Sequence, residues 1–320
     1  MWNKIKLTCC CIFFLAGLTH CHNMGTETLD SSSLAGCSWT TWTARDSVRN
    51  WAAITSSSDG TKMAAVELNG FIYTSTDSGH TWTQRGTSQP WYGIASSADG
   101  TKLVATEGGG VLGDVYVSTD SGVTWTATGN AGYWYSVASS SDGTNLVATT
   151  QGIEIYTSTD GGHTWSAGPS TGWTAVASSA DGTKLLGATW GAHLFTSTNS
   201  GTSWNSEATP QTWASVSSSA DGTILLGGAY GGKIYYSSDS GSTWTAQDSS
   251  RNWSATGMSS TGSVMFAGES GGLLYVSTDA GVTWSPKATV QSWKAVAAST
   301  DGKTVAAAAS GGQIYTSNCQ

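Results

Sequence analysis

One short, repeated phrase carries residues that could do chemistry. It reads STDSGHTW at residues 75–82, and close copies return along the chain with an acid or an amide at the third position. A carboxylate presented this often could act in acid–base chemistry, bind a metal or stabilise a turn. The six residues at this position are Asp77, Asp120, Asp160, Asn199, Asp239 and Asp279.

The composition of the phrase favours the turn. An aspartate side chain accepts hydrogen bonds from backbone amides a few positions later, and Gly79 in the first copy can adopt conformations that are costly for other residues. Asn199 keeps the acceptor oxygen but carries no charge. Calcium needs six or more oxygen ligands, whereas each copy offers one carboxylate. We therefore expect a structural role for the six residues, with no metal and no cofactor.

The phrases belong to a longer repeat. A tryptophan opens a similar segment, such as WTAVASSADGTK at residues 173–184, every 39 to 43 residues. Each unit contains four short apolar runs separated by turn residues, and none has helical periodicity. Repeats of about forty residues with four strands are typical of propeller blades. We expect an all-β fold, a seven-bladed β-propeller of four-stranded antiparallel blades.

The opening tryptophans of the repeats admit two interpretations. They could form an aromatic collar for sugar stacking, but packing between blades is favoured because they recur without variation. They are Trp51, Trp91, Trp134, Trp173, Trp213, Trp253 and Trp293.

The two ends of the repeat region are complementary. The last unit has three strands, and the segment before Trp51 supplies one, with Trp42 nine residues upstream, the spacing found in other units. We expect this N-terminal strand to complete the last blade. Cys37 and Cys319 both fall at the Asp position of the phrase, where the chain is cut, so a disulfide would replace the missing connection.

The phrase also supports a family resemblance. S-x-D-x-G-x-T-W resembles the Asp-box, or BNR repeat, of sialidases, sortilin-type receptors, xyloglucanases and photosystem assembly propellers, and the matching repeats run from Cys37 to Cys319. The resemblance implies that each Asp-box lies between the third and fourth strands of a blade, at the periphery and away from the ligand face.

The N-terminal region has a different composition. Lys4 and Lys6 precede an apolar run from Leu7 to Leu18, which is typical of an export signal. We predict a signal peptide at residues 1–20, a flexible Ser-, Thr- and Gly-containing tether at residues 21–36, and the propeller at residues 37–320.

Cys21 is a candidate lipidation site. The sequence LTHC at residues 18–21 resembles a bacterial lipobox, although His20 stands where a small residue is usual. With Cys37 and Cys319 paired, lipidation would account for the remaining cysteine of the exported chain. The alternative is that Cys21 is removed with an ordinary signal. We expect an exported monomer in a bacterial cell envelope, either attached to a membrane through an N-terminal lipid or periplasmic or extracellular.

The charge balance excludes one class of partner. The formal net charge is -8 and the pI is near 4.9. Nucleic-acid binders normally present a basic face, so we expect no nucleic-acid partner.

Candidate binding residues lie where the repeats differ. The loops that enter each first strand and the turns between second and third strands should share one face, opposite the Asp phrases, and Trp190 and Tyr230 replace the acid of other repeats there. The residues on that face could be solvent-exposed loop residues that vary because nothing constrains them, or they could form a ligand-binding surface. The candidates are Arg45, Arg49, Arg85, Glu107, Asp114, Glu154, Trp190, Tyr230, Arg251 and Glu269.

Three functions fit these features, and no residue is assigned as catalytic. The favoured one is a non-enzymatic scaffold that binds a protein or glycan ligand in the cell envelope. The alternative is a sialidase-like or other glycoside hydrolase, for which Arg45, Arg85 and Arg251 would hold a substrate carboxylate. A two-acid mechanism would draw on Glu107, Asp114 and Glu154. A purely structural role is the third.

Overall fold

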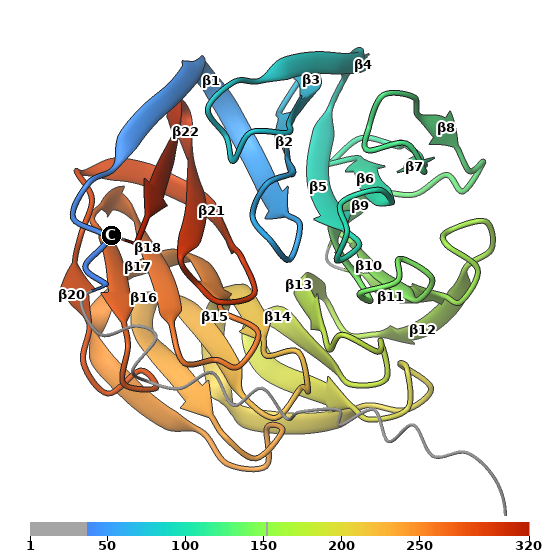
Figure 1. Cartoon of the computed structure of the whole chain (residues 1–320). Helices are drawn as coiled ribbons and strands as arrows, with labels where there is room; N and C mark the ends of the chain where they lie inside the picture. Colours follow the sequence, from blue (N-terminus) through green and yellow to red (C-terminus); the bar gives the residue numbers. More distant parts are fainter. Residues whose placement is uncertain (1–36, 152, 320) are drawn as a thin grey trace, which may run out of the picture.

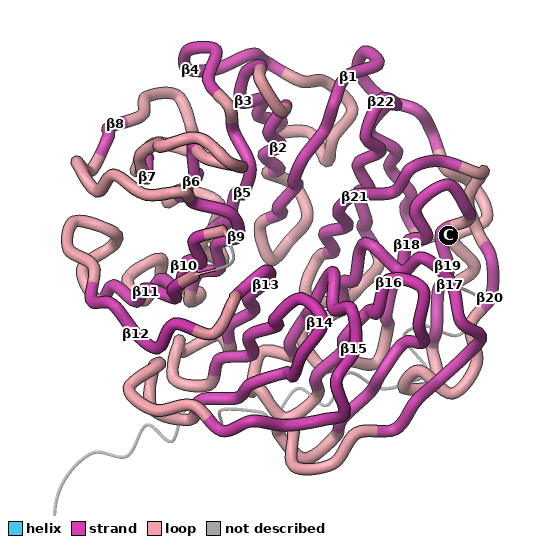
Figure 2. Tube along the Cα trace, turned by 180° about the vertical axis from the view of Figure 1, so that it is seen from behind, coloured by secondary structure: helices cyan, strands magenta, loops and turns pink. Residues whose placement is uncertain are grey.

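The computed structural model describes residues 37–151 and 153–319. The predicted signal peptide, the tether and Cys21 lie outside the described residues. Within them every regular element is a β-strand, and no helix is long and apolar enough to cross a membrane. Figure 1 shows the sheets arranged around a central axis in chain order, and Figure 2 shows the same ring from behind.

The strands pair antiparallel in groups of four. The first group contains β1 (Thr43–Ser56), β2 (Met63–Glu67), β3 (Gly70–Ser75) and β4 (Thr83–Gln89). The others are β5 (Trp91–Ser96), β6 (Leu103–Glu107), β7 (Val115–Ser118), β8 (Thr126–Ala127), β9 (Trp134–Ser139), β10 (Leu146–Thr150), β11 (Glu154–Ser158), β12 (Ser166–Ser170), β13 (Trp173–Ser178), β14 (Leu185–Ser197), β15 (Asn205–Ser218), β16 (Leu225–Ser237), β17 (Thr245–Met258), β18 (Met265–Gly272), β19 (Leu274–Ser277), β20 (Ser285–Pro286), β21 (Gln291–Ala298) and β22 (Thr304–Asn318).

Several strands are longer than the short runs expected from the sequence. The first half of β15 pairs with β14, and its second half, from Trp213, pairs with β16. One continuous strand therefore leaves one sheet and enters the next. A positive-φ residue, such as Ala208 in β15 or Asp248 in β17, forms a bulge that turns the strand without ending it.

The ends of the chain meet as predicted. β1 pairs antiparallel with β22, with Thr43 opposite Thr316, and a disulfide joins Cys37 to Cys319 with Cα atoms 4.9 Å apart. Beside the disulfide, Trp39 is buried and packs edge-on against Phe266 with ring centroids 5.9 Å apart.

A ring of backbone hydrogen bonds circles the axis. The turn after the first strand of each unit contains Asp-Gly, or Thr261-Gly262 in one unit, and is called the DG turn. One amide in each DG turn donates to a carbonyl of the next turn at 2.7–2.9 Å, and Thr300 N donates to Ser58 O at 2.7 Å, which closes the ring. The donors are Ser58, Ala98, Ser141, Ala180, Ala220, Ser260 and Thr300. Each repeat is thus joined to the next by more than side-chain packing.

The opening tryptophans form the core between sheets. Their side chains are 0–2 % exposed, so a sugar-stacking collar is wrong for them. Each packs on an aromatic ring of the third strand, as Trp51 does on Tyr73 with centroids 5.2 Å apart and planes at 75°. Edge-to-face packing of this kind adds to the stabilisation from burial. The tryptophans therefore determine the spacing of the sheets rather than the binding face.

Candidate functional site

The six Asp turns, meaning the copies of the STDSGHTW phrase, are closed by their own hydrogen bonds. In the first copy Ser75 Oγ donates to Asp77 Oδ1 at 2.7 Å, Thr81 N donates to the same oxygen at 2.9 Å, and Thr81 Oγ1 donates to Oδ2 at 2.6 Å. Gly79 N donates to Ser75 Oγ at 2.9 Å. Both carboxylate oxygens of Asp77 therefore accept hydrogen bonds from groups of their own turn.

The electrostatics of the turns agree with this role. Hydrogen bonds from the Thr124 side chain and backbone and from Ser118 lower the pKa of Asp120 to about 2. In the fourth copy Asn199 Oδ1 accepts from Ser203 N at 2.9 Å, and its Nδ2 donates to Ser203 Oγ at 2.9 Å. The amide reproduces the geometry without charge, so the turns are structural joints between third and fourth strands.

Two of the candidate arginines hold neighbouring strands together. Arg45 Nε donates to Thr316 Oγ1 at 3.0 Å, and Arg85 Nε donates to Thr74 Oγ1 at 3.0 Å. The two arginines occupy equivalent places in a fourth strand beside the third strand of the same sheet.

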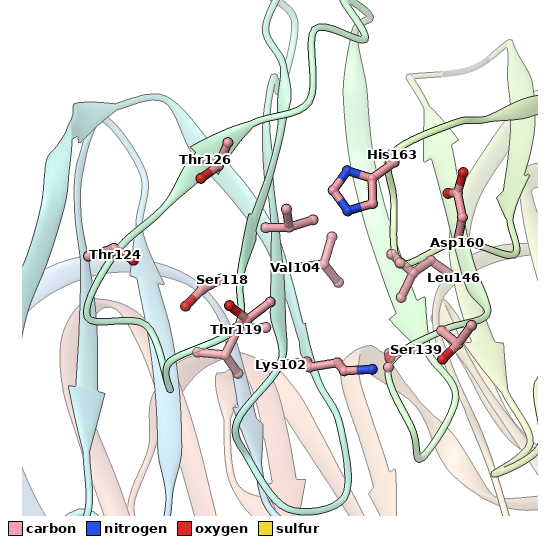
Figure 3. A pocket seen from close by; sticks show the side chains of 15 residues that line it. Lys102, Val104, Ser118, Thr119, Thr124, Thr126, Ser139, Leu146, Asp160 and His163 are labelled. Atoms are coloured by element: carbon pink, nitrogen blue, oxygen red, sulfur yellow. The ribbon is translucent and has the colours of Figure 1, made fainter.

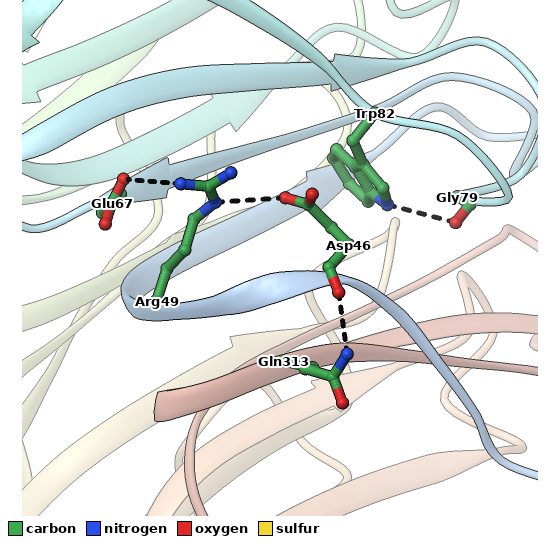
Figure 4. A network of polar contacts seen from close by, with 6 residues as sticks. All are labelled: Asp46, Arg49, Glu67, Gly79, Trp82 and Gln313. Atoms are coloured by element: carbon green, nitrogen blue, oxygen red, sulfur yellow. Dashed lines mark hydrogen bonds and ion pairs between the residues drawn. The ribbon is translucent and has the colours of Figure 1, made fainter.

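The other two arginines lie in matching ion-pair clusters. Arg49 Nε lies 3.3 Å from Asp46 Oδ2, and its Nη1 lies 3.7 Å from Glu67 Oε2 (Figure 4). The guanidinium also lies 4.4 Å from the Tyr73 ring centroid. Half-buried guanidinium groups of this kind bind both carboxylate and aromatic faces. Arg49 lies on the part of β1 that pairs with β22, whereas Glu67 and Tyr73 lie on β2 and β3, so the cluster engages Arg49 across the junction of two sheets.

The second cluster repeats the first on β17 and β18. Arg251 Nε lies 3.7 Å from Asp248 Oδ2, its Nη1 lies 3.8 Å from Glu269 Oε2, and the Tyr275 ring centroid is 4.7 Å from the guanidinium. Because Arg251 and Arg49 are each held in their own cluster, the structure does not bring the arginines together around a common ligand.

The remaining acidic candidates also have internal partners. Asp114 accepts from Gly129 N and Asn130 N at 2.9 Å each, so it holds the longer loop of the second repeat. Glu107 Oε2 accepts from Asp114 N at 3.4 Å, and Glu154 accepts from the Tyr156 hydroxyl. These contacts give each carboxylate a structural role in its own sheet.

Trp190 and Tyr230 do not replace the acid. Glu107 lies opposite Trp91 in the sheet, and the residues opposite Trp173 and Trp213 are Thr189 and Ala229. Trp190 and Tyr230 come one residue later, and they are 60 % and 43 % exposed. The one-residue difference turns both side chains toward the face of the ring.

Both of these aromatic residues line a cavity of about 440 Å³ at the axis. Each opening tryptophan is followed by a residue that lines it: Ala52, Tyr92, Tyr135, Thr174, Ala214, Ser254 and Lys294. Lys294 is the one charged side chain among the described residues around the cavity. Sequence reasoning missed Lys294, although the position after each tryptophan varies while the tryptophan does not.

The cavity combines aromatic surface with one cation. The Tyr92 and Tyr135 rings lie 4.4 Å apart, and Lys294 Nζ lies 5.8 Å from the Tyr92 ring centroid. Burial and the neighbouring Tyr135 phenol raise the pKa of Tyr92. Like any tyrosine with a pKa near or above its ordinary value of about 10, Tyr92 is a neutral phenol at pH 7 and can hydrogen-bond a ligand. The arrangement suits a ligand with a carboxylate and apolar surface.

The described residues contain no group of three or more His, Cys, Asp or Glu side chains placed to hold a metal ion.

Comparison with known proteins shows the class of fold. No protein-family model matches the chain, and no curated protein matches it. Among solved structures, YCF48 from Cyanidioschyzon merolae matches with a TM-score of 0.69 and 15 % identity over 87 % of this chain and 98 % of that one. A structure described as YCF48 bound to D1 peptide matches with a TM-score of 0.67 and 16 % identity, over 88 % and 96 % of the two chains.

An enzyme shares the architecture. The GH74 enzyme of Niastella koreensis matches with a TM-score of 0.65 and 22 % identity over 84 % of this chain, which spans 43 % of the enzyme. With the four-stranded antiparallel sheets, these likenesses show that the chain is a β-propeller. At such identities the likeness extends to the fold and not to the activity.

Proposed function

We propose that this protein is an exported, lipid-anchored, seven-bladed β-propeller of the Asp-box class that binds a protein segment in the cell envelope through its axial cavity. The closed ring of seven DG-turn hydrogen bonds supports the blade count. Five S-x-D-x-G-x-T-W turns, a sixth copy with Asn199 and Ser203 in place of the Asp and Thr, and the hydrogen bonds that the copies share support the class.

The observation that carries the binding role is the composition of the cavity. Trp190 and Tyr230 expose large aromatic surfaces beside it, and the Lys294 ammonium group has no hydrogen-bond or ion-pair partner among the described residues. Exposed aromatic residues around a central pocket are typical of protein-binding hot spots. A segment with an acidic group next to apolar side chains would match this surface. One propeller of similar fold is described as bound to a peptide.

A peptide-display experiment tests the proposal. The purified exported protein is panned against random peptides, with a Lys294→Met variant in parallel and Lys303→Met, in a DG turn away from the cavity, as the matched control. We expect acidic peptides with apolar neighbours from the parent and the control, and about tenfold weaker binding to Lys294→Met. Equal binding to all three proteins would contradict the proposal.

The anchor is tested separately. Cys21→Ser should abolish incorporation of a labelled fatty acid and release the protein from the membrane fraction. Continued incorporation of label by the variant would refute lipidation at this cysteine.

A further inference from the structure

A second cavity opens between the second and third repeats. It has a volume of about 550 Å³ (Figure 3). Residues of a DG turn and of an Asp turn, such as Gly143 and Gly161, line it, and it shares no lining residue with the axial cavity. The corresponding crevices at three other junctions enclose about 10 Å³ each. The cavity between the second and third repeats is therefore far larger than the equivalent crevices at these three junctions.

Two of the other junctions are closed by a lysine and a serine. Lys62 Nζ donates to Ser121 Oγ in the Asp turn of the next repeat at 3.3 Å, and Lys184 Nζ donates to Ser240 Oγ at 3.3 Å. Each bond holds a lysine across the crevice between two sheets. The lysine side chain then fills space that a ligand would need.

The open junction has the lysine without the serine. Lys102 is the equivalent of Lys62, and its Nζ donates to the Asp142 carbonyl at 2.8 Å, but the position of Ser121 is taken by Gly161. Gly161 adopts φ 71°, close to the 61° of Ser121, so the backbone of the turn is conserved and only the hydroxyl is missing. The ammonium of Lys102 is left with hydrogen-bonding capacity facing the groove.

The third strand beside this junction also lacks a cover. At the preceding junction Arg85 lies over Thr74 through its 3.0 Å hydrogen bond. The equivalent residues here are Thr128 and Val117, which are too short and too apolar to form that contact. With β8 only two residues long, the outer wall of the groove stays open.

The walls of the groove are amphipathic. Val104, Val117 and Leu146 provide an apolar floor. The hydroxyls of Thr119 and Thr126 form no hydrogen bond with other described residues, and Figure 3 shows them on one side of the groove with His163 on the other. Asp160 also lines the groove, but Thr164 and Ser158 already occupy its oxygens.

We propose that this groove binds an acidic sugar unit of a glycan. The sugar carboxylate would pair with Lys102 Nζ, its hydroxyls would bond Thr119 and Thr126, and the apolar face of its ring would lie on Val117 and Leu146. The volume is that of an ordinary small-molecule site. A peptide is a poorer match, because the edge of β8 offers only two residues for backbone pairing. The site is independent of the axial cavity.

Calorimetric titration of the exported protein with a galacturonic acid disaccharide, and with the neutral galactose disaccharide, tests the proposal. We expect the acidic disaccharide to bind and the neutral one to bind about tenfold more weakly or worse. Lys102→Met and Gly161→Ser should each weaken binding of the acidic disaccharide by a similar factor. Lys184→Met, at a closed junction, is the matched control and should leave binding unchanged. Serine is tolerated at positive φ in the equivalent turns, so Gly161→Ser should fold, as a melting curve would verify.

Several outcomes would overturn the assignment. They are no heat from the acidic disaccharide at millimolar concentration, equal binding of the neutral sugar, or full binding by Lys102→Met. Stronger binding of a diglutamate peptide than of the acidic sugar would assign the groove to peptides instead. Loss of peptide binding in Lys294→Met with sugar binding intact would show that the two sites are separate.

Discussion

The amide of Thr300 donates a 2.7 Å hydrogen bond to the carbonyl of Ser58, and this contact joins the last repeat to the first. The pairing of β1 with β22 and the disulfide between Cys37 and Cys319 join the same ends again. Closure is therefore shared among backbone, sheet and covalent contacts. No single one of them has to hold the ring by itself.

Removing the disulfide should destabilise the ring without abolishing the fold. For a loop as long as the 282-residue separation of Cys37 and Cys319, the chain-entropy estimate is on the order of 5 kcal/mol. Cys37→Ser should lower the melting temperature, and reductant should lower that of the parent to a similar value. A melt of the parent that does not respond to reductant would refute the prediction.

The Arg49 cluster should contribute stability and not binding. Arg49→Met loses contacts to Asp46, Glu67 and the Tyr73 ring, and the groups are partly exposed, so we expect a loss of about 1 kcal/mol. Urea denaturation of the parent and the variant measures this difference in the free energy of unfolding. Arg251→Met is the matched variant in the second cluster and should behave alike, while peptide binding by both stays at the parent level. Loss of peptide binding in either variant would show that the clusters face a ligand.

The Asp turns should make stability depend on acid pH. The pKa of Asp120 is about 2, below the usual value of about 4 for an unfolded chain, so its charge stabilises the fold above about pH 4 and ceases to do so as the pH falls through 2. Asp120→Asn should lower the melting temperature slightly at pH 6 and less at pH 2, because the amide keeps the acceptor as Asn199 does. Asp120→Ala should lower it at both. Equal losses for Asp120→Asn at the two pH values would contradict the electrostatic origin.

A structural role and a catalytic role for Glu107 and Asp114 predict different effects of substitution. Asp114→Ala loses hydrogen bonds from Gly129 N and Asn130 N, so it should cost about 1–3 kcal/mol of stability. If Glu107 and Asp114 are structural, Glu107→Ala should leave any turnover of fluorogenic sialosides and glucosides unchanged. Turnover by the parent that disappears in Glu107→Ala would establish the hydrolase instead.

The sequence determined the repeat because the same physical demand recurs in every unit. A tryptophan must fill each gap between sheets, and a carboxylate or amide must satisfy the amides of each Asp turn, so both recur at a fixed spacing. The pairing of Cys37 with Cys319 followed from the same register. These features are local or periodic, and periodic features can be recognised without coordinates.

The tertiary structure decided which variable residues face a ligand. Arg49 and Arg251 look alike and exposed in sequence, but each contacts a carboxylate on its own strand and a carboxylate and a tyrosine ring of the neighbouring sheet. Lys294 comes from the last repeat and Tyr92 from the second, and only closure of the ring places them around one cavity. A one-residue difference in register turned Trp190 to the surface, because successive side chains of a strand point to opposite sides.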